Sequence, residues 1–315
     1  MQNRRGFLKG AFAAAASTVV PRAFATKPAL SDEYTALLAD THISGLEKRV
    51  AYSGTCLERR IADILRRDPL PKRVVVFGDI AYLYGKRADY VKAAPYFKLL
   101  TDLGIEVTYG LGNHDRREPF WEVFAGEAGK SPVKNRQIAV ASPVGVDLLM
   151  LDSLDQPPTD ERWISPGDIG GEQGEWLLAE LPKWKRPVLV CAHHPLSELK
   201  AGGEPLVKLL CKSQNVVGFV HGHNHFWKKN VYENWGGVGY WELLRSVSLP
   251  CTGLYGDIGY AWMHSSATCC RIDNVESDCY FNAPVPKERR QLAWDSMLKE
   301  NTGDYIEFHI PRRRT

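Results

Sequence analysis

Several short apolar segments of this 315-residue chain end directly in side chains that bind metals. The segments at 74–77 and 216–220 are continuous apolar runs, as expected for strands buried on both faces of a parallel sheet. Segments with helical spacing lie between such runs, and strands that alternate with helices predict an α/β fold. Because the carboxyl ends of parallel strands meet at one edge of a sheet, the polar residues that follow them are expected to lie close together.

The first two strand ends supply carboxylates and an imidazole. The strand expected at 34–39 leads into Asp40 and His42, whose Asp-x-His spacing puts both side chains on one side of an extended backbone. The run at 74–77 leads into Asp79, and a carboxylate can bridge two cations because it has two oxygens. Each motif has an ordinary alternative, a turn carboxylate beside a surface histidine for the first and a helix cap for the second.

A third strand ends in a glycine-rich loop that carries Asn113, His114 and Asp115. Asn113 is a neutral oxygen ligand, and His114 is a candidate catalytic acid or electrostatic donor whose ring Asp115 would orient. Asn and Asp beside Gly are also ordinary turn residues, so this loop indicates a metal site only in combination with the other strand ends. Arg116 and Arg117 follow, and we expect each at the solvated surface unless one of them reaches a phosphate oxygen.

Two further strands end in histidines. His193 emerges directly from a buried strand and is the expected ligand, whereas the next residue, His194, is expected to be structural. The last strong strand runs into His223 and His225, whose His-x-His spacing puts two imidazoles on the same side. Three histidines within five residues are hard to explain by packing, although the first of them, His221, is expected to be structural.

The first 25 residues are expected to be an export signal. Arg4 and Arg5 precede Phe-Leu-Lys, an apolar run follows, and Ala23-Phe24-Ala25 is a small-x-small cleavage pattern. The segment resembles a twin-arginine signal, which implies passage through the twin-arginine translocation machinery to a periplasmic or secreted location. The apolar run is short for a bilayer span, so no stable membrane anchor is expected; an uncleaved anchor is the alternative.

The charge of the chain argues against a nucleic-acid partner. The formal net charge is +3, from 40 basic and 37 acidic residues. Four of the basic residues lie in the signal, which leaves 36 basic against 37 acidic residues in the mature chain. No basic field then remains to attract nucleic acid, and we expect a small-molecule partner.

Seven cysteines are present without a Cys-x-x-Cys pair, which gives no support to a zinc ribbon or a thioredoxin-type motif. Four of the seven fall between 251 and 279, where an oxidising compartment could pair some of them. Cys191, inside an apolar run, is the expected free thiol. A thiol-redox role for the neighbours Cys269 and Cys270 would leave the histidines unexplained.

The domain organisation follows from these segments. We expect a signal at 1–25, one catalytic domain at 34–283, and a peripheral C-terminal extension at 284–315 with a helix near 289–298. Within the domain, the polar segment 152–171 is a candidate lid over the site. Helices are expected at 47–67, 88–103 and 172–181, and a hairpin at 137–151.

Taken together, the five strand ends resemble the motif series of the calcineurin-like metallophosphoesterases, over about residues 34 to 272. The resemblance implies a four-layer αββα sandwich with a dinuclear metal centre at one end of its sheets. It implies two divalent or mixed-valence ions, and mixed N and O ligands without thiolate suit Fe, Mn or Zn. The assignment that it implies is Asp40, His42 and His225 on one ion, Asn113, His193 and His223 on the other, and Asp79 as the bridge.

The implied reaction is the hydrolysis of a small-molecule phosphate mono- or diester by metal-activated hydroxide. In it, His114 would stabilise or protonate the leaving oxygen while Asp115 holds its tautomer. The alternative is a non-catalytic metal-binding protein on the same fold. A degenerate protein of that kind would be expected to lack His114 or a ligand, and this chain keeps the complete set.

Two details bear on the subfamily. The Gly-Asp-x-x-Tyr segment that ends at Tyr82 is similar to that of purple acid phosphatases, in which the tyrosine binds ferric iron, but His42 departs from their first motif. The Leu-Asp-Ser at 151–153 and the segment from Gln173 to Leu177 look like class III cyclic-nucleotide phosphodiesterases. Export argues against a cytoplasmic cyclic nucleotide as the physiological substrate without excluding diesterase chemistry.

Overall fold

The computed structural model of the chain describes residues 30–46, 52–156, 166–233, 242–253, 256–276 and 303–310. The expected signal at 1–25, the expected helix near 289–298 and Cys279 lie outside these ranges. Within them, no helix is both long enough and apolar enough to cross a bilayer.

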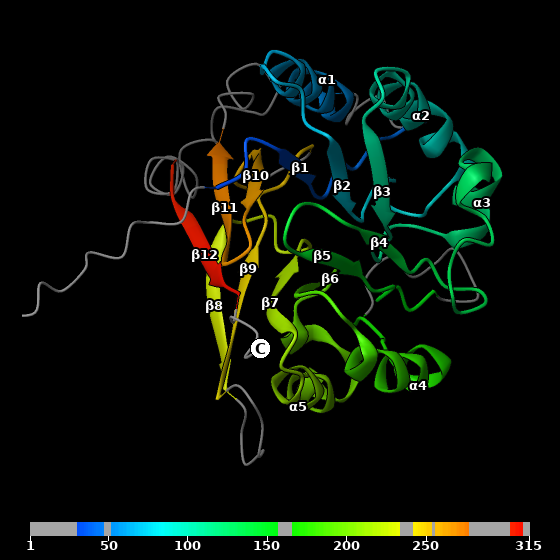
Figure 1. Cartoon of the computed structure of the whole chain (residues 1–315). Helices are drawn as coiled ribbons and strands as arrows, with labels where there is room; N and C mark the ends of the chain where they lie inside the picture. The colour runs from blue at the N-terminus through cyan, green and yellow to red at the C-terminus, as the bar shows by residue number, and fades with distance from the viewer. Residues whose placement is uncertain are drawn as a thin grey trace, which may run out of the picture.

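The first sheet has six strands in the order β12-β11-β10-β1-β2-β3 (Figure 1). β1, β2 and β3 run parallel, so the three strand ends that carry the first motifs lie side by side at one edge. The strands are β1 (Tyr34–Leu38), β2 (Arg73–Phe77), β3 (Glu106–Gly110), β10 (Gly259–Ser265), β11 (Cys269–Glu276) and β12 (Tyr305–His309).

The second sheet also has six strands, in the order β4-β5-β6-β7-β9-β8. β6 and β7 are parallel neighbours, which brings the two histidine-bearing strand ends together. The strands are β4 (Ala139–Ala141), β5 (Asp147–Met150), β6 (Val188–Ala192), β7 (Val216–His221), β8 (Lys228–Glu233) and β9 (Leu243–Ser248). β4 and β5 form the expected antiparallel hairpin.

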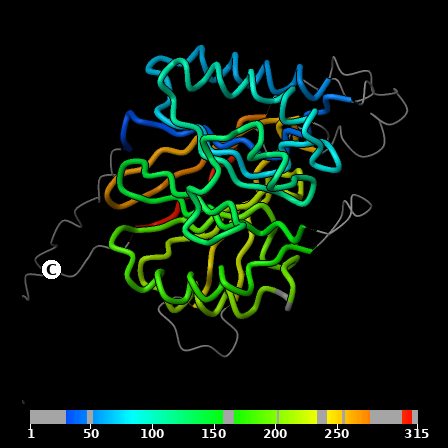
Figure 2. Tube along the Cα trace, turned by 90° about the vertical axis from the view of Figure 1, so that its right-hand side faces the viewer, coloured from blue at the N-terminus to red at the C-terminus, as the bar shows by residue number. Residues whose placement is uncertain are grey.

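Helices cover the outer face of each sheet, and the two sheets pack against each other (Figure 2). Alternation along β1 shows the arrangement, because Ala36 and Leu38 pack under the helices whereas Leu37 faces the second sheet. The helices are α1 (Tyr52–Leu65), α2 (Arg87–Asp102) and α3 (Arg117–Val123) by the first sheet, and α4 (Gly171–Glu180) and α5 (Glu204–Lys212) by the second. This is the expected four-layer αββα sandwich.

Four short 3-10 turns complete the described elements: η2 (Ala125–Glu127), η3 (Leu181–Lys183), η4 (Leu196–Glu198) and η5 (Lys200–Gly203). Among the α-helices, α3 and α5 were not expected from the sequence. α5 has only nine residues, and it is stabilised because Leu206, Val207 and Leu210 are buried against the second sheet.

The segment expected to be a peripheral extension contributes a strand to the fold. β12 pairs antiparallel with β11, and Ile306 and Phe308 lie buried between the two sheets. A Cβ atom at Gly218 of β7 would lie 2.2 Å from the Phe308 ring, so this glycine makes room for the aromatic side chain. Residues 305–309 are therefore part of the sandwich core rather than peripheral.

Two cysteines can be compared with the expectations from the sequence. Cys191 is a buried free thiol, as expected for a cysteine inside an apolar strand. Cys270 is also a buried free thiol, which counts against the redox pair that it would form with Cys269.

Candidate metal centre

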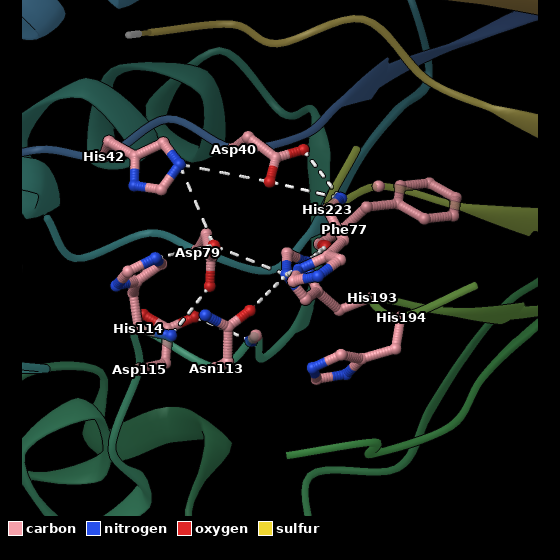
Figure 3. A network of polar contacts seen from close by, with 12 residues as sticks. Asp40, His42, Phe77, Asp79, Asn113, His114, Asp115, His193, His194 and His223 are labelled. Carbon is pink, nitrogen blue, oxygen red and sulfur yellow. Dashed lines mark hydrogen bonds and ion pairs between the residues drawn. The ribbon is translucent and has the colours of Figure 1, made fainter. Parts of the chain in front are cut away.

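Figure 3 shows eight of the nine predicted site residues at one edge of the sandwich, where strand ends of both sheets meet. The ninth, His225, joins them there through its contact with His42 at 3.0 Å. A hydrogen bond from His193 Nδ1 to the carbonyl oxygen of Phe77 crosses between the sheets at 2.8 Å. The backbone N–H of His223 donates to both oxygens of Asp40, at 3.2 and 3.1 Å, and makes a second such link. The motifs therefore form one cluster.

The backbone is strained at this cluster. Six non-glycine residues in the described part of the chain have a left-handed backbone, and five of them belong to the predicted site. Their φ angles are +56° at Asp40, +46° at His42, +48° at Asp79, +69° at His223 and +62° at His225. Such conformations each cost about 1–3 kcal/mol and persist where a function requires the geometry.

Asp79 lies at the centre of the cluster. Its Oδ2 is 3.3 Å from His193 Nε2 and 3.8 Å from the Nε2 atoms of both His42 and His114. Its Oδ1 accepts the backbone N–H of His114 at 2.9 Å. One carboxylate oxygen thus faces three imidazoles from different strand ends, which is the position expected of a bridging ligand.

Backbone carbonyls fix the tautomers of these three imidazoles. A carbonyl oxygen can only accept, so each Nδ1 that contacts one carries a proton, and each ring directs Nε2 at the cluster. The pairs are His42 with Tyr82 at 3.2 Å, His114 with Leu83 at 3.1 Å, and His193 with Phe77 at 2.8 Å.

The donor atoms form two groups that could each hold an ion. In the first, His225 Nε2 lies 3.0 Å from His42 Nε2 and 3.3 Å from Asp40 Oδ1. Asp40, His42, Asp79 and His225 all offer ligand atoms within 4.8 Å of one another.

In the second group, His193 Nε2 lies 3.1 Å from both Asn113 Oδ1 and His223 Nδ1. His193, His194 and His223 also offer ligand atoms within 4.8 Å of one another. Asp79 reaches both groups through the contacts of its Oδ2 with His42 and His193.

The charges of the site favour cations. Asp40 and Asp79 are buried, and burial raises the pKa of a carboxyl group, but their imidazole neighbours outweigh this and lower both pKa values. Burial lowers the pKa of His193, yet the two carboxylates raise it to about 9. Burial lowers the pKa of His42 to about 3, so its ring is neutral. Without an ion His193 therefore holds a proton at neutral pH, which a bound cation would displace. Buried carboxylates beside imidazole nitrogens are a donor set that fits divalent cations.

Close approach of the backbone makes this geometry possible. A Cβ atom on Gly112 would lie 2.2 Å from Asp79 Oδ1, inside the space that the carboxylate occupies. Glycine at this position therefore lets the β3 loop pass beside the central carboxylate.

The role expected for Asp115 needs correction. Its carboxylate accepts the backbone N–H groups of Ile80, Ala81 and Gly112 and the hydroxyl of Tyr90, whereas the ring of His114 is held by a carbonyl. Burial, and then the charge of Asp79, raise the pKa of Asp115 to about 7. A cation beside Asp79 would favour the ionised form that four donors require.

The expectation of solvated arginines after this loop is also wrong, because Arg116 and Arg117 are both buried. Arg117 makes a two-pronged ion pair with Asp152, at 2.7 and 2.9 Å, and Asp152 also accepts the backbone N–H of Gln137. The start of the expected lid is thus packed inside the protein, and residues 157–165 lie outside the described ranges.

Three further side chains border the site. His194 is bonded to Ser153 Oγ at 2.8 Å, and its ring lies apart from the cluster around Asp79 in Figure 3. His221 is buried on β7, and burial lowers its pKa to about 4. Glu198 contacts His223 Nε2 at 2.9 Å, and sequence reasoning missed it because no strand or spacing pattern connects the two residues.

Comparison with known proteins gives the same family. The calcineurin-like phosphoesterase family matches residues 35–226. A probable cyclic nucleotide phosphodiesterase of Rhodopseudomonas palustris is 30% identical over 165 residues, which cover 50% of this chain and 56% of that protein. The chain thus spans little more than half the length of this relative.

Solved structures show the same fold at low identity. A dimetal phosphatase from Danio rerio superposes with a TM-score of 0.57 at 15% identity, over 77% of this chain and 95% of that one. A purple acid phosphatase, PPD1, from yellow lupin (Lupinus luteus) seeds also gives 0.57, at 12% identity, over 90% of this chain and 54% of that one. With most of the sandwich inside the family match, the chain belongs to the calcineurin-like phosphoesterases.

Proposed function

We propose that this protein hydrolyses phosphate esters at a dinuclear metal centre. The observation that carries the proposal is Asp79 Oδ2, which faces His42 on one side and His193 on the other, at 3.8 and 3.3 Å. The proposed ligands are Asp40, His42 and His225 for one ion, Asn113, His193 and His223 for the other, with Asp79 shared. This mixed set of nitrogen and oxygen donors suits Fe, Mn or Zn.

When bound, the ions would supply Lewis acidity toward the phosphoryl oxygens and a hydroxide nucleophile near neutral pH. The chain itself supplies His114, whose Nδ1 is tied to the Leu83 carbonyl and whose Nε2 points to the same oxygen of Asp79. We propose His114 as the donor that stabilises or protonates the leaving oxygen; because Nδ1 already donates to Leu83, this role requires a second proton on Nε2, so the ring would act as the imidazolium. Asp115 fixes the positions of the loops that carry Asp79 and His114 relative to each other through its four hydrogen bonds.

Diesters are the substrate class to test first, because the curated relative is named a probable cyclic nucleotide phosphodiesterase. We also propose export of the folded protein through the twin-arginine machinery to the periplasm or beyond, on the strength of Arg4, Arg5 and the pattern that ends at Ala25. Fusion of residues 1–25 to a reporter that is active only after folded export tests this; Arg4→Lys with Arg5→Lys should abolish the signal.

The activity is tested by hydrolysis of bis(p-nitrophenyl) phosphate beside p-nitrophenyl phosphate. Turnover should require metal, so a chelator should abolish it and Mn²⁺ should restore it, and the ratio of the two rates identifies a diesterase or a monoesterase. Asp79→Asn and His193→Ala should each remove metal and activity together. Full activity in either variant would contradict the site. Metal-loaded protein without turnover of either ester would favour a non-catalytic metal-binding protein.

A further inference from the structure

His223 faces the cluster with a different ring nitrogen from the histidines that are bound to backbone carbonyls. His42, His114 and His193 donate Nδ1–H to a carbonyl and direct Nε2 at the cluster. His223 directs Nδ1 at the cluster, 3.1 Å from His193 Nε2, and its Nε2 lies 2.9 Å from the carboxylate of Glu198. An ionised carboxylate can only accept, so Nε2 carries the proton and Nδ1 presents the lone pair.

The backbone around Glu198 is fixed although its side chain is 48% exposed. Glu198 ends η4, which begins three residues after His193, and its N–H donates to the Pro195 carbonyl at 3.0 Å. Its own carbonyl accepts the N–H of Gly167 at 2.9 Å. The fixed backbone therefore places the Glu198 carboxylate within hydrogen-bonding distance of His223 Nε2.

We propose that Glu198 is a positioning residue, which holds His223 in its Nε2–H form and so directs Nδ1 at the second metal ion. The inference rests on the proposed dinuclear function. A carboxylate on the distal nitrogen of a ligating imidazole fixes both the tautomer and the ring orientation and makes the ligand more basic. His193, a proposed ligand of the same ion, does not share this dependence, because a backbone carbonyl holds its ring.

The first experiment measures Mn²⁺ binding to the full-length protein by calorimetry. Glu198→Ala should lower the affinity for one of the two Mn²⁺ ions by about tenfold to a hundredfold and leave the affinity for the other unchanged. Glu198→Gln keeps an acceptor oxygen without the charge and should recover part of the affinity. The matched control is Glu204→Ala, which removes an exposed glutamate that pairs with Lys208 on α5. This variant should bind both Mn²⁺ ions with wild-type affinity.

The second experiment reads the tautomer directly in the metal-free protein, by long-range ¹H–¹⁵N spectra of the histidine rings. His223→Ala identifies the resonances of His223, which should show a protonated Nε2 in the wild type and a mixture of tautomers in Glu198→Ala. Unchanged affinity for both ions together with an unchanged tautomer would overturn the role of Glu198 alone. A wild-type protein that binds no metal would overturn the proposed function and this inference with it.

Discussion

Asp115 connects two loops of the candidate site and does not orient the ring of His114. Its two oxygens accept four hydrogen bonds, of which two come from the backbone after Asp79 and one from Gly112 in the β3 loop. Each loop carries a proposed ligand, Asp79 in one and Asn113 in the other. The carboxylate thus fixes the spacing between the proposed bridging ligand and a proposed terminal ligand.

Asp115→Asn tests this connection. An amide offers one oxygen and turns an NH2 group toward buried donors, so at least one N–H loses its partner at a cost of about 1–3 kcal/mol. We expect the free energy of unfolding to fall by that amount in urea titrations and metal affinity to fall as well. Asp102→Asn on the exposed side of α2, where Asp102 pairs with Lys98, is the control and should be nearly neutral. Equal stability of the two variants would contradict the role.

His114→Ala separates chemistry from metal binding. His114 is outside both donor groups, so the variant should keep two metals while the rate falls by about 10²–10⁴, the usual contribution of a general acid. Metal analysis and turnover with the same preparation provide the comparison, with His193→Ala as the variant that should lose metal. If His114→Ala also lost an ion, His114 would move into the ligand set.

The positions of the proposed ligands at strand ends could be predicted from the sequence because these residues closely follow apolar strands, as Asp79 follows β2 and His193 follows β6. The hydrogen-bond partners of Asp115 and His223 could not be predicted in this way. They are backbone amides and a glutamate that are brought near only when separate loops return to the same edge. Hydrogen bonds of this kind leave no periodic pattern in a sequence.

At the scale of elements, β7 and β9 enclose polar groups that lack partners. His221 pairs with Ser248 and Phe219 with Ser246, so the side chains of His221, Ser246 and Ser248 share one face of the second sheet. Within the part of the chain that the structure describes, His221 Nε2 and both serine hydroxyls have no hydrogen-bond partner, and all three residues are buried. Such groups are a cost to stability.

Ser246→Ala and Ser248→Ala should therefore be neutral or stabilising, by up to about 1 kcal/mol, although most substitutions at buried positions destabilise. Ser153→Ala is the matched control: Ser153 is equally buried, but its hydroxyl bonds to His194, and we expect a loss of about 1 kcal/mol. Urea unfolding of the three variants gives the comparison. A loss at Ser246 or Ser248 as large as at Ser153 would show that an ordered water bonds these hydroxyls.

Helices and strands could be predicted where a continuous hydrophobic pattern marks them. A strand that pairs with a strand far away in the sequence was missed. Helix α2 and the β4–β5 hairpin correspond to continuous patterns in the sequence. β12 pairs with β11 more than thirty residues away along the chain. Its two buried side chains, Ile306 and Phe308, give too short a pattern to place it in a sheet.

At the scale of the whole molecule, the proposed ions connect the two halves of the sandwich. Asp40 and His42 follow a strand of the first sheet, and His225 follows a strand of the second. The second ion would likewise join Asn113, from the first sheet, to His193 and His223, from the second. Each ion would therefore bind only when the sheets are packed, and binding should stabilise the complete fold.

Removal of metal should consequently lower the stability of the entire protein in one cooperative transition. An ion present at a thousand times its Kd adds about 4 kcal/mol to the folded state, and for a chain of this size each kcal/mol corresponds to about 2–4 °C in Tm. We expect a chelator to lower Tm by several degrees, Mn²⁺ to restore it, and His193→Ala to show a smaller response to both. The measurement is thermal unfolding followed by circular dichroism, with metal content determined on the same samples. A Tm that does not change while metal leaves would mean that the ions do not bridge the sheets. A chelator effect as large in His193→Ala as in the wild type would mean that the stabilising ion binds elsewhere.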